Sequence, residues 1–202
     1  MKWKYIAYLT VVFLLASACE KEPGRIDNFL MEFATVVKPA GQITFQLDNN
    51  KTLIPKELKD YSGKDGQRVV LNYTPLRGDT VKINSVSDIF TGTVEGSSAV
   101  ANLIKDPVKI QSVWVGGNYL NLILEIEYYD KAHVIGLFHD TQSPTIDLHF
   151  SHSRNNDPPG YTKKLYASFS LAAIKSPNGS PTPFRLHINT QSGERVFELE
   201  VK

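Results

Sequence analysis

The chain has 202 residues, of which 42% are hydrophobic and 21% are charged, and its 22 basic and 21 acidic residues nearly balance. This apolar content is enough to bury a core, so the composition excludes a disordered polypeptide. The single cysteine excludes a disulfide framework, and the small net charge excludes a strong electrostatic field around the protein.

Residues 1–18 have the pattern of a secretory signal peptide. Lys2 and Lys4 precede an apolar run over residues 5–15, and three small residues follow at 16–18. The apolar run is shorter than the roughly 20 residues that span a bilayer, and charged residues end it, so we do not expect a retained transmembrane helix.

Cys19 directly follows the small residues, which is typical of a bacterial lipobox. In such a signal the cysteine sulfur is acylated, the signal peptide is removed, and the new amino terminus is acylated as well. Several acyl chains such as palmitate hold a protein firmly at a membrane, whereas one chain binds only weakly. Ala16 departs from the leucine that is usual in a lipobox, and an ordinary signal peptide with a chance cysteine is the alternative. We therefore predict that Cys19 is lipidated and anchors an outer membrane lipoprotein, at the periplasmic face or the cell surface.

The mature chain begins with a polar tether over residues 19–30, and residues 31–104 are predicted to form the first domain. Apolar and polar residues alternate near 43–47, 69–73 and 81–89, which indicates strands, and a turn-like sequence follows the first of them. Residues 92–105 contain glycine, serine and alanine without such alternation. This segment is interpreted as the domain boundary or a short connecting helix.

Residues 105–202 are predicted to form a second domain with a still more regular strand pattern. In "NYLNLILEIEYYD", which ends at Asp130, every second residue is apolar, as in a half-buried strand. The same period recurs near 146–150, 184–188 and 197–201, and proline-rich segments separate these strands. The pattern predicts an all-β protein whose second domain is an antiparallel β-sandwich.

Three segments carry a resemblance to a known family. "KDGQRVVLNY" at 64–73, "VWVGGNYLNLILEIEYYD" at 113–130 and "TIDLHFSH" at 145–152 resemble the NigD-like lipoproteins of Gram-negative anaerobes. The resemblance implies an N-terminal OB-like β-barrel followed by a C-terminal β-sandwich, and a role in bacteriocin immunity. It provides no catalytic residues.

The most specific part of the resemblance is also the candidate binding site. Trp114 and Tyr119 flank a turn of two glycines and an asparagine, and aromatic faces of this kind bind glycans or peptides. The alternative is that Trp114 fills the core and the glycines form a tight turn. The predicted partner is an unknown protein or glycan. Residues 31–108 contain nine basic and nine acidic residues, so no nucleic acid is expected there.

The sequence contains no metalloprotease, esterase or nucleotide-binding motif, so we predict that the protein is not an enzyme and has no cofactor. Glu125 and Glu127 have a spacing that glycosidases use, which leaves an envelope polysaccharide hydrolase as the alternative function. His149 and His152 are expected on opposite faces of one strand, so they would not bind one metal ion together. No metal site is predicted, although a sequence cannot show whether two of the five histidines meet.

Overall fold

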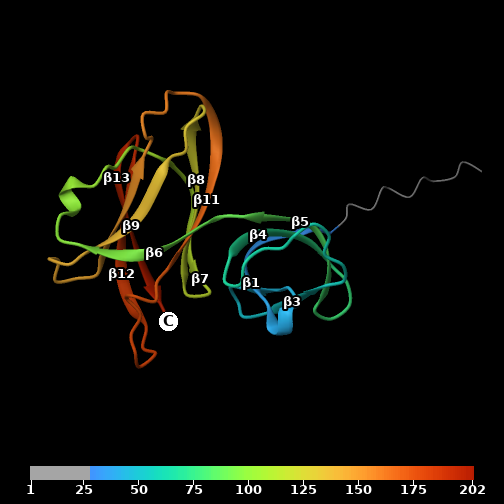
Figure 1. Cartoon of the computed structure of the whole chain (residues 1–202). Coiled ribbons are helices and arrows are strands. Elements are labelled where there is room, and N and C mark those ends of the chain that lie inside the picture. Colours follow the sequence, from blue (N-terminus) through green and yellow to red (C-terminus); the bar gives the residue numbers. More distant parts are fainter. Residues whose placement is uncertain (1–27) are drawn as a thin grey trace, which may run out of the picture.

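The computed structural model describes residues 28–202, and Cys19 and the predicted signal peptide lie outside this range. The described chain forms two β domains side by side (Figure 1), a closed five-stranded barrel and an eight-stranded sheet. The all-β prediction, with an OB-like barrel before a β-sandwich, is confirmed. Within residues 28–202, no helix is long and apolar enough to span a membrane.

The barrel has the strand order β1-β2-β3-β5-β4 and closes where β4 pairs with β1. Its elements are β1 (Leu30–Val37), the 3₁₀ helix η1 (Pro39–Gly41), β2 (Thr44–Leu47), β3 (Thr52–Pro55), β4 (Arg68–Pro75) and β5 (Thr80–Asp88). Alternate residues of these strands point inward, because side chains on a strand alternate between its two faces. The barrel core consists of Ala34, Val36, Phe45, Leu47, Leu53, Val69, Leu71, Tyr73 and Val81.

The second domain has the strand order β13-β12-β10-β9-β6-β11-β8-β7. Its elements are β6 (Phe90–Ser97), the 3₁₀ helix η2 (Val100–Asn102), β7 (Lys109–Gly116), β8 (Tyr119–Tyr128), β9 (Val134–Asp140), β10 (Asp147–Ser153), β11 (Tyr161–Ser170), β12 (Thr182–Thr190) and β13 (Gly193–Val201). Four of the pairings are antiparallel: three join consecutive strands, and the fourth joins β8 to β11. The other three are parallel, which makes the sheet mixed: β6 pairs with β9 and with β11, and β10 pairs with β12.

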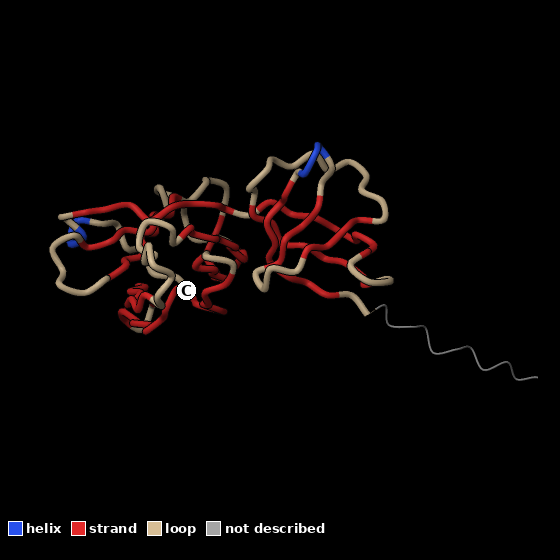
Figure 2. Tube along the Cα trace, turned by 90° about the horizontal axis from the view of Figure 1, so that it is seen from below, coloured by secondary structure: helices blue, strands red, loops and turns tan. Residues whose placement is uncertain are grey.

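This sheet curls around one apolar core, and its two ends approach each other (Figure 2). Val108, just before β7, forms a bridge with Thr190 at the end of β12, and β7 also contacts β13. The core includes the apolar face of β8, where Leu120, Leu122 and Leu124 are fully buried. The sheet therefore forms a sandwich that is nearly closed into a barrel.

A single residue, Ile89, separates β5 of the barrel from β6 of the second sheet. β6 leaves the barrel and runs into the middle of the second sheet (Figure 1), where it pairs with strands on both sides. The sequence assigned residues 31–104 to the first domain, whereas the structure places β6 in the second. Val94 is the only buried residue of β6, so the strand lacks the apolar alternation that would have indicated it.

Candidate functional site at the domain junction

Arg68 lies at the centre of the contact between the two domains. It opens β4 of the barrel and is completely buried. Its Nη2 donates to Asn121 Oδ1 at 2.9 Å, its Nε donates to Ser168 Oγ at 3.2 Å, and its Nη1 lies 2.7 Å from Asp48 Oδ1. Nη1 also donates to Thr35 Oγ1 at 3.1 Å. A buried guanidinium is stable only when it is paired in this way, so the network fixes the barrel against the sandwich.

Asp48, in the turn after β2, brings the β7–β8 hairpin into the same network. Asn121 Nδ2 donates to Asp48 Oδ2 at 2.9 Å. A Cβ atom at Gly116 would lie 2.8 Å from Asp48 Oδ2, and one at Gly117 would lie 2.7 Å from Asp48 Oδ1. Gly117 and Asn118 have φ angles of +57° and +66°, which is typical of a two-residue type I′ hairpin turn. The two glycines therefore allow the hairpin to approach Asp48 closely.

Aromatic side chains pack across the junction beside this polar network. The rings of Phe33 from the barrel and Trp114 from β7 meet edge to face, with centroids 4.9 Å apart, and Tyr166 lies 6.1 Å from Phe33. Val70 and Ile89 complete the small apolar cluster from the barrel side. Trp114 thus belongs to the contact between domains, and the glycines form the tight turn that the alternative interpretation proposed.

Tyr119 packs against the buried arginine. The Arg68 guanidinium lies over its ring, 4.5 Å from the centroid, which is a cation–π arrangement. Tyr119 opens β8 next to the turn, so the hairpin contributes both this ring and Asn121 to the environment of Arg68. The motif from Trp114 to Asn121 is therefore an interdomain motif.

A groove of about 440 Å³ lies at the junction and has walls from both domains. Met31 and Phe33 line it from β1, Trp114 and Tyr166 line it from the second domain, and Lys164 lies at its border. Tyr119 is not among its lining residues. The binding role predicted for Trp114 and Tyr119 stays a prediction. Trp114 lines the groove, whereas Tyr119 lies against Arg68.

The groove also carries fixed charges. Glu32 lies in its wall, and its carboxylate accepts a hydrogen bond from the Tyr73 hydroxyl. Burial, together with this carboxylate, raises the pKa of Tyr73 well above its usual range. Glu32 and Lys164 therefore place charges of opposite sign beside the aromatic surface.

Two of the histidines meet inside the second domain. His133 Nδ1 lies 2.9 Å from His152 Nε2, and His152 Nδ1 lies 3.0 Å from the carbonyl oxygen of Asp106. Burial lowers the pKa of His152. His133 Nε2 lies 3.3 Å from Asp157, a carboxylate with no exposed side-chain surface. Burial opposes ionisation of Asp157, but backbone N–H donors of residues 129–131, together with His133, hold its pKa well below the usual range.

The remaining candidate residues lie apart from this pair. His149 is on the opposite face of β10 from His152, as predicted, and it meets His187 of β12. His139 and Asp140 end β9. Among the carboxylates with glycosidase spacing, Glu125 pairs with Lys109 Nζ at 2.8 Å and Glu127 pairs with Arg154 Nη2 at 3.3 Å.

The fold and the junction define a class of two-domain β proteins, in which an OB-type barrel is fixed to a β-sandwich. The chain belongs to the NigD-like family: residues 33–89 match the NigD-like N-terminal OB domain, and residues 92–201 match the NigD-like C-terminal beta sandwich domain. The resemblance seen in the sequence is therefore confirmed. No curated protein sequence matches the chain significantly.

Solved structures of proteins from Parabacteroides and Bacteroides species share this fold. A protein from Parabacteroides distasonis, described as toxin-related, is 26% identical, with a TM-score of 0.77 over 87% of this chain and 94% of its own. A NigD-like immunity protein from Bacteroides caccae is 25% identical, with a TM-score of 0.68 over 84% of this chain and 90% of its own. A Bacteroides fragilis protein described as a lipoprotein is 12% identical and shares the fold, with a TM-score of 0.67 over 86% of this chain and 98% of its own.

Proposed function

We propose that the chain is a lipid-anchored protein of the Gram-negative cell envelope that acts by binding another protein and not by catalysis. The partner is a bacteriocin-type toxin, and binding protects the cell that makes the lipoprotein. A structure similar to this chain is that of a NigD-like immunity protein, which supports this assignment.

The observation that carries the proposal is the groove at the domain junction. Its walls come from β1, β4 and the turn after β2 in the barrel, and from β7, β8 and β11 in the second domain. It therefore exists only while the two domains keep their relative position. The Arg68 network holds that position before any partner arrives. A surface formed in advance loses little conformational freedom on binding, which favours affinity.

The chemistry of the groove suits a protein partner. Met31 is 58% exposed at its edge, and Trp114 and Tyr166 add aromatic surface. Methionine and aromatic residues are enriched in protein interfaces, and charges such as Lys164 and Glu32 at the border add specificity.

The anchor in this proposal is Cys19, which lies outside the described residues. β1 begins at Leu30, eleven residues later. A fully extended tether of that length reaches about 40 Å. Lipidation of Cys19 would therefore keep the barrel close to the membrane surface.

A non-catalytic role is also supported by the pairing of the carboxylates that suggested a hydrolase. Glu125 and Glu127 each have a basic partner of their own, Lys109 and Arg154. A glycosidase needs one carboxyl group that is protonated and one that is ionised, in a shared cleft. The two carboxylates instead lie in separate salt bridges, each with its own basic partner.

Deletion of the gene in its own strain tests the proposal. We expect the deletion strain to become sensitive to a bacteriocin encoded nearby, the intact gene to restore protection, and Cys19→Ala to be found in the soluble fraction without restoring it. Unchanged sensitivity of the deletion strain would contradict the immunity role. Release of reducing sugars from envelope polysaccharide by the purified chain would instead support the hydrolase.

A further inference from the structure

A row of ionisable side chains crosses the outer face of the second sheet, far in sequence from the junction motif. Its members come from β10, β12 and β13: Asp147, His149, Arg185, His187 and Glu194. β10 and β12 are parallel neighbours, and His149 and His187 are aligned in register. The residues next to them, Leu148 and Leu186, are fully buried in the core. The alternation of side chains therefore directs both histidines to the outer face.

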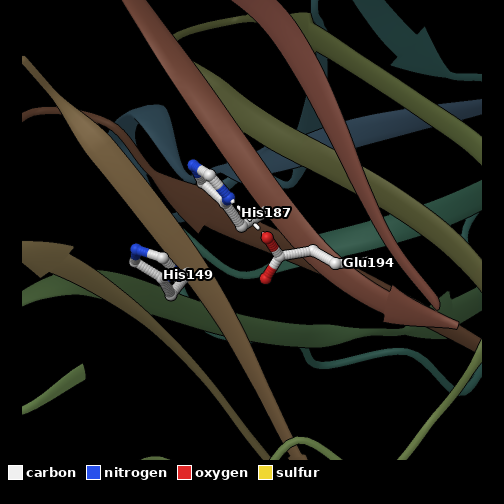
Figure 3. Close-up of side chains that lie close together, drawn as sticks. All are labelled: His149, His187 and Glu194. Atoms are coloured by element: carbon white, nitrogen blue, oxygen red, sulfur yellow. Dashed lines mark hydrogen bonds and ion pairs between the residues drawn. The ribbon is translucent and has the colours of Figure 1, made fainter. Parts of the chain in front are cut away.

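The two imidazoles and the Glu194 carboxylate come together (Figure 3). The rings of His149 and His187 are stacked, with centroids 4.4 Å apart and planes 19° from parallel. His187 Nδ1 lies 3.1 Å from Glu194 Oε1. One ligand atom from each of the three residues lies within 4.8 Å of the others.

Asp147 orients His187 by contacting the ring nitrogen that does not face Glu194. Its carboxylate is buried and accepts two hydrogen bonds from Arg185, at 2.6 and 2.8 Å. The hydroxyl groups of Ser143 and Thr145 donate to the same carboxylate, so every neighbour other than His187 is a donor to it. Asp147 is thus an acceptor only, and His187 Nε2, at 3.2 Å from Oδ1, must carry the proton between them.

The other ring nitrogen of His187, Nδ1, then faces a second hydrogen-bond acceptor. With its proton on Nε2, a neutral His187 presents a lone pair at Nδ1, and that lone pair faces the acceptor Oε1 of Glu194. Two acceptors at 3.1 Å require a positive species between or beside them, either a second proton on His187 or a metal ion. A histidine that donates one N–H to a carboxylate and binds a metal through its other nitrogen is a recurrent arrangement in metal sites.

We propose that His149, His187 and Glu194 bind a Zn²⁺ ion on the outer face of the sandwich, with Asp147 as the residue that positions His187. Imidazole nitrogen and carboxylate oxygen are common Zn²⁺ ligands, and three protein ligands leave a fourth position for water. Bonds of about 2.1 Å in a tetrahedral site require ligand atoms about 3.4 Å apart. The three ligand atoms now lie within 4.8 Å of one another. Because the two rings are stacked, the His149 ring must turn to direct its lone pair at the ion, and the exposed Glu194 side chain must rotate toward it.

His149 is prepared for this role by its surroundings. Its ring is partly buried and lies against that of His187, so the two imidazoles are already close together. Lys105 Nζ lies 3.4 Å from His149 Nδ1. Its positive charge opposes a divalent ion, so Lys105 sets an upper limit on the affinity.

The ion would link three strands at one end of the second sheet. Glu194 belongs to β13, which is the edge strand, while His187 and His149 belong to β12 and β10. Zn²⁺ that binds the folded chain but not the unfolded chain must raise the stability of the fold. The site lies away from the groove, so this inference does not depend on the proposed function.

Zinc titration of the full chain tests the site. The protein is prepared without an affinity tag and with Cys19→Ala, so that no thiol competes, and binding is followed by calorimetry and by the melting temperature. We expect one Zn²⁺ per chain and a higher melting temperature with Zn²⁺ than with a chelator. His149→Ala and the exposed Glu194→Gln should each weaken binding at least about tenfold. His139→Ala is the matched control, because its strand register with Leu148 places it on the other face of the sheet.

Lys105→Met tests the proposal through an expected gain, and not a loss, of Zn²⁺ affinity. Removal of the ammonium group should strengthen Zn²⁺ binding severalfold, an effect that loss of fold cannot produce. Circular dichroism in the presence of chelator shows whether each variant is folded before zinc is added. The proposal is overturned if the parent chain shows no saturable one-to-one binding, or if His149→Ala binds Zn²⁺ as tightly as the parent.

Discussion

The Arg68 guanidinium donates to the Asn121 side-chain carbonyl at 2.9 Å, although 53 residues and a domain boundary separate the two. Asn121 in turn donates to Asp48, which pairs with Arg68, so the three side chains form a closed network. A barrel and a sandwich that share one buried charge network behave as one body. The position of the groove follows from this coupling.

Arg68→Met should destabilise the protein by about 3 kcal/mol, because it leaves the Asp48 carboxylate and the Asn121 amide without their charged partner. Arg68→Lys should recover little of this loss, since an ammonium group cannot reproduce the guanidinium contacts. Urea unfolding measures both. The control is Arg77→Met, an exposed arginine in the barrel, which should change the free energy of unfolding by less than about 0.5 kcal/mol. Equal effects at the two positions would show that the network is not a determinant of stability.

Gly117→Ala should cost more stability than Gly179→Ala. Both glycines have positive φ, +57° and +75°, so both substitutions strain the backbone by about 1 kcal/mol or more. Only at Gly117 does the new Cβ also meet another part of the chain, the Asp48 side chain at 2.7 Å and its Cα at 3.2 Å. Thermal unfolding of the two variants measures the difference. If they unfold at the same temperature, the approach of the hairpin to Asp48 is looser than described.

The stability of the fold should decrease as the pH falls from about 6.5 to 5. Burial lowers the pKa of His152, so in this range the unfolded chain binds a proton that the folded chain does not. Stability is therefore present above the unfolded-state pKa of about 6.5 and is lost below it. His149, whose pKa is also lowered, contributes with the same sign.

Urea unfolding at several pH values measures this dependence. His152→Gln should reduce the slope of the unfolding free energy against pH, while the contribution of His149 remains. The ionised carboxylates of Asp147 and Asp157 act in a separate and more acidic window, below about pH 4, because their pKa values are lowered. A stability that is constant, or that increases, between pH 6.5 and 5 would contradict the burial of a neutral His152.

Much of the fold follows from patterns that the sequence shows locally. Alternation in β8 predicts which of its side chains are buried, and Leu120, Leu122 and Leu124 all lie in the core. The turn at Gly117 and Asn118 is equally local, because it depends on residues that tolerate positive φ. The strand β6 was not predicted because Val94 is its only buried residue and glycines occupy the neighbouring positions on that face, Gly92 and Gly96. Pairing with strands on both sides defines it as a strand.

The junction could not be predicted, because its chemistry depends on long-range contacts. Arg68 opens an apolar strand, a position where an exposed charged residue is also common. Its burial depends on distant partners: Asp48 in the barrel, and Asn121 and Ser168 in the other domain. The contact between His149 and His187 could not be predicted either, because it also depends on long-range strand pairing. One sequence shows that each lies on the outer face of a strand, but not that β10 and β12 are parallel neighbours.

Protection by groove variants in the deletion strain is the most direct test of the proposed function. Met31→Glu and Lys164→Glu alter the groove at exposed positions, and Ile54→Glu, at a 50% exposed residue of β3 outside the groove, is the matched control. We predict that the two groove variants reach the membrane in normal amounts but leave the cell sensitive to the bacteriocin, while Ile54→Glu protects as well as the parent protein. Full protection by both groove variants would contradict binding at the domain junction.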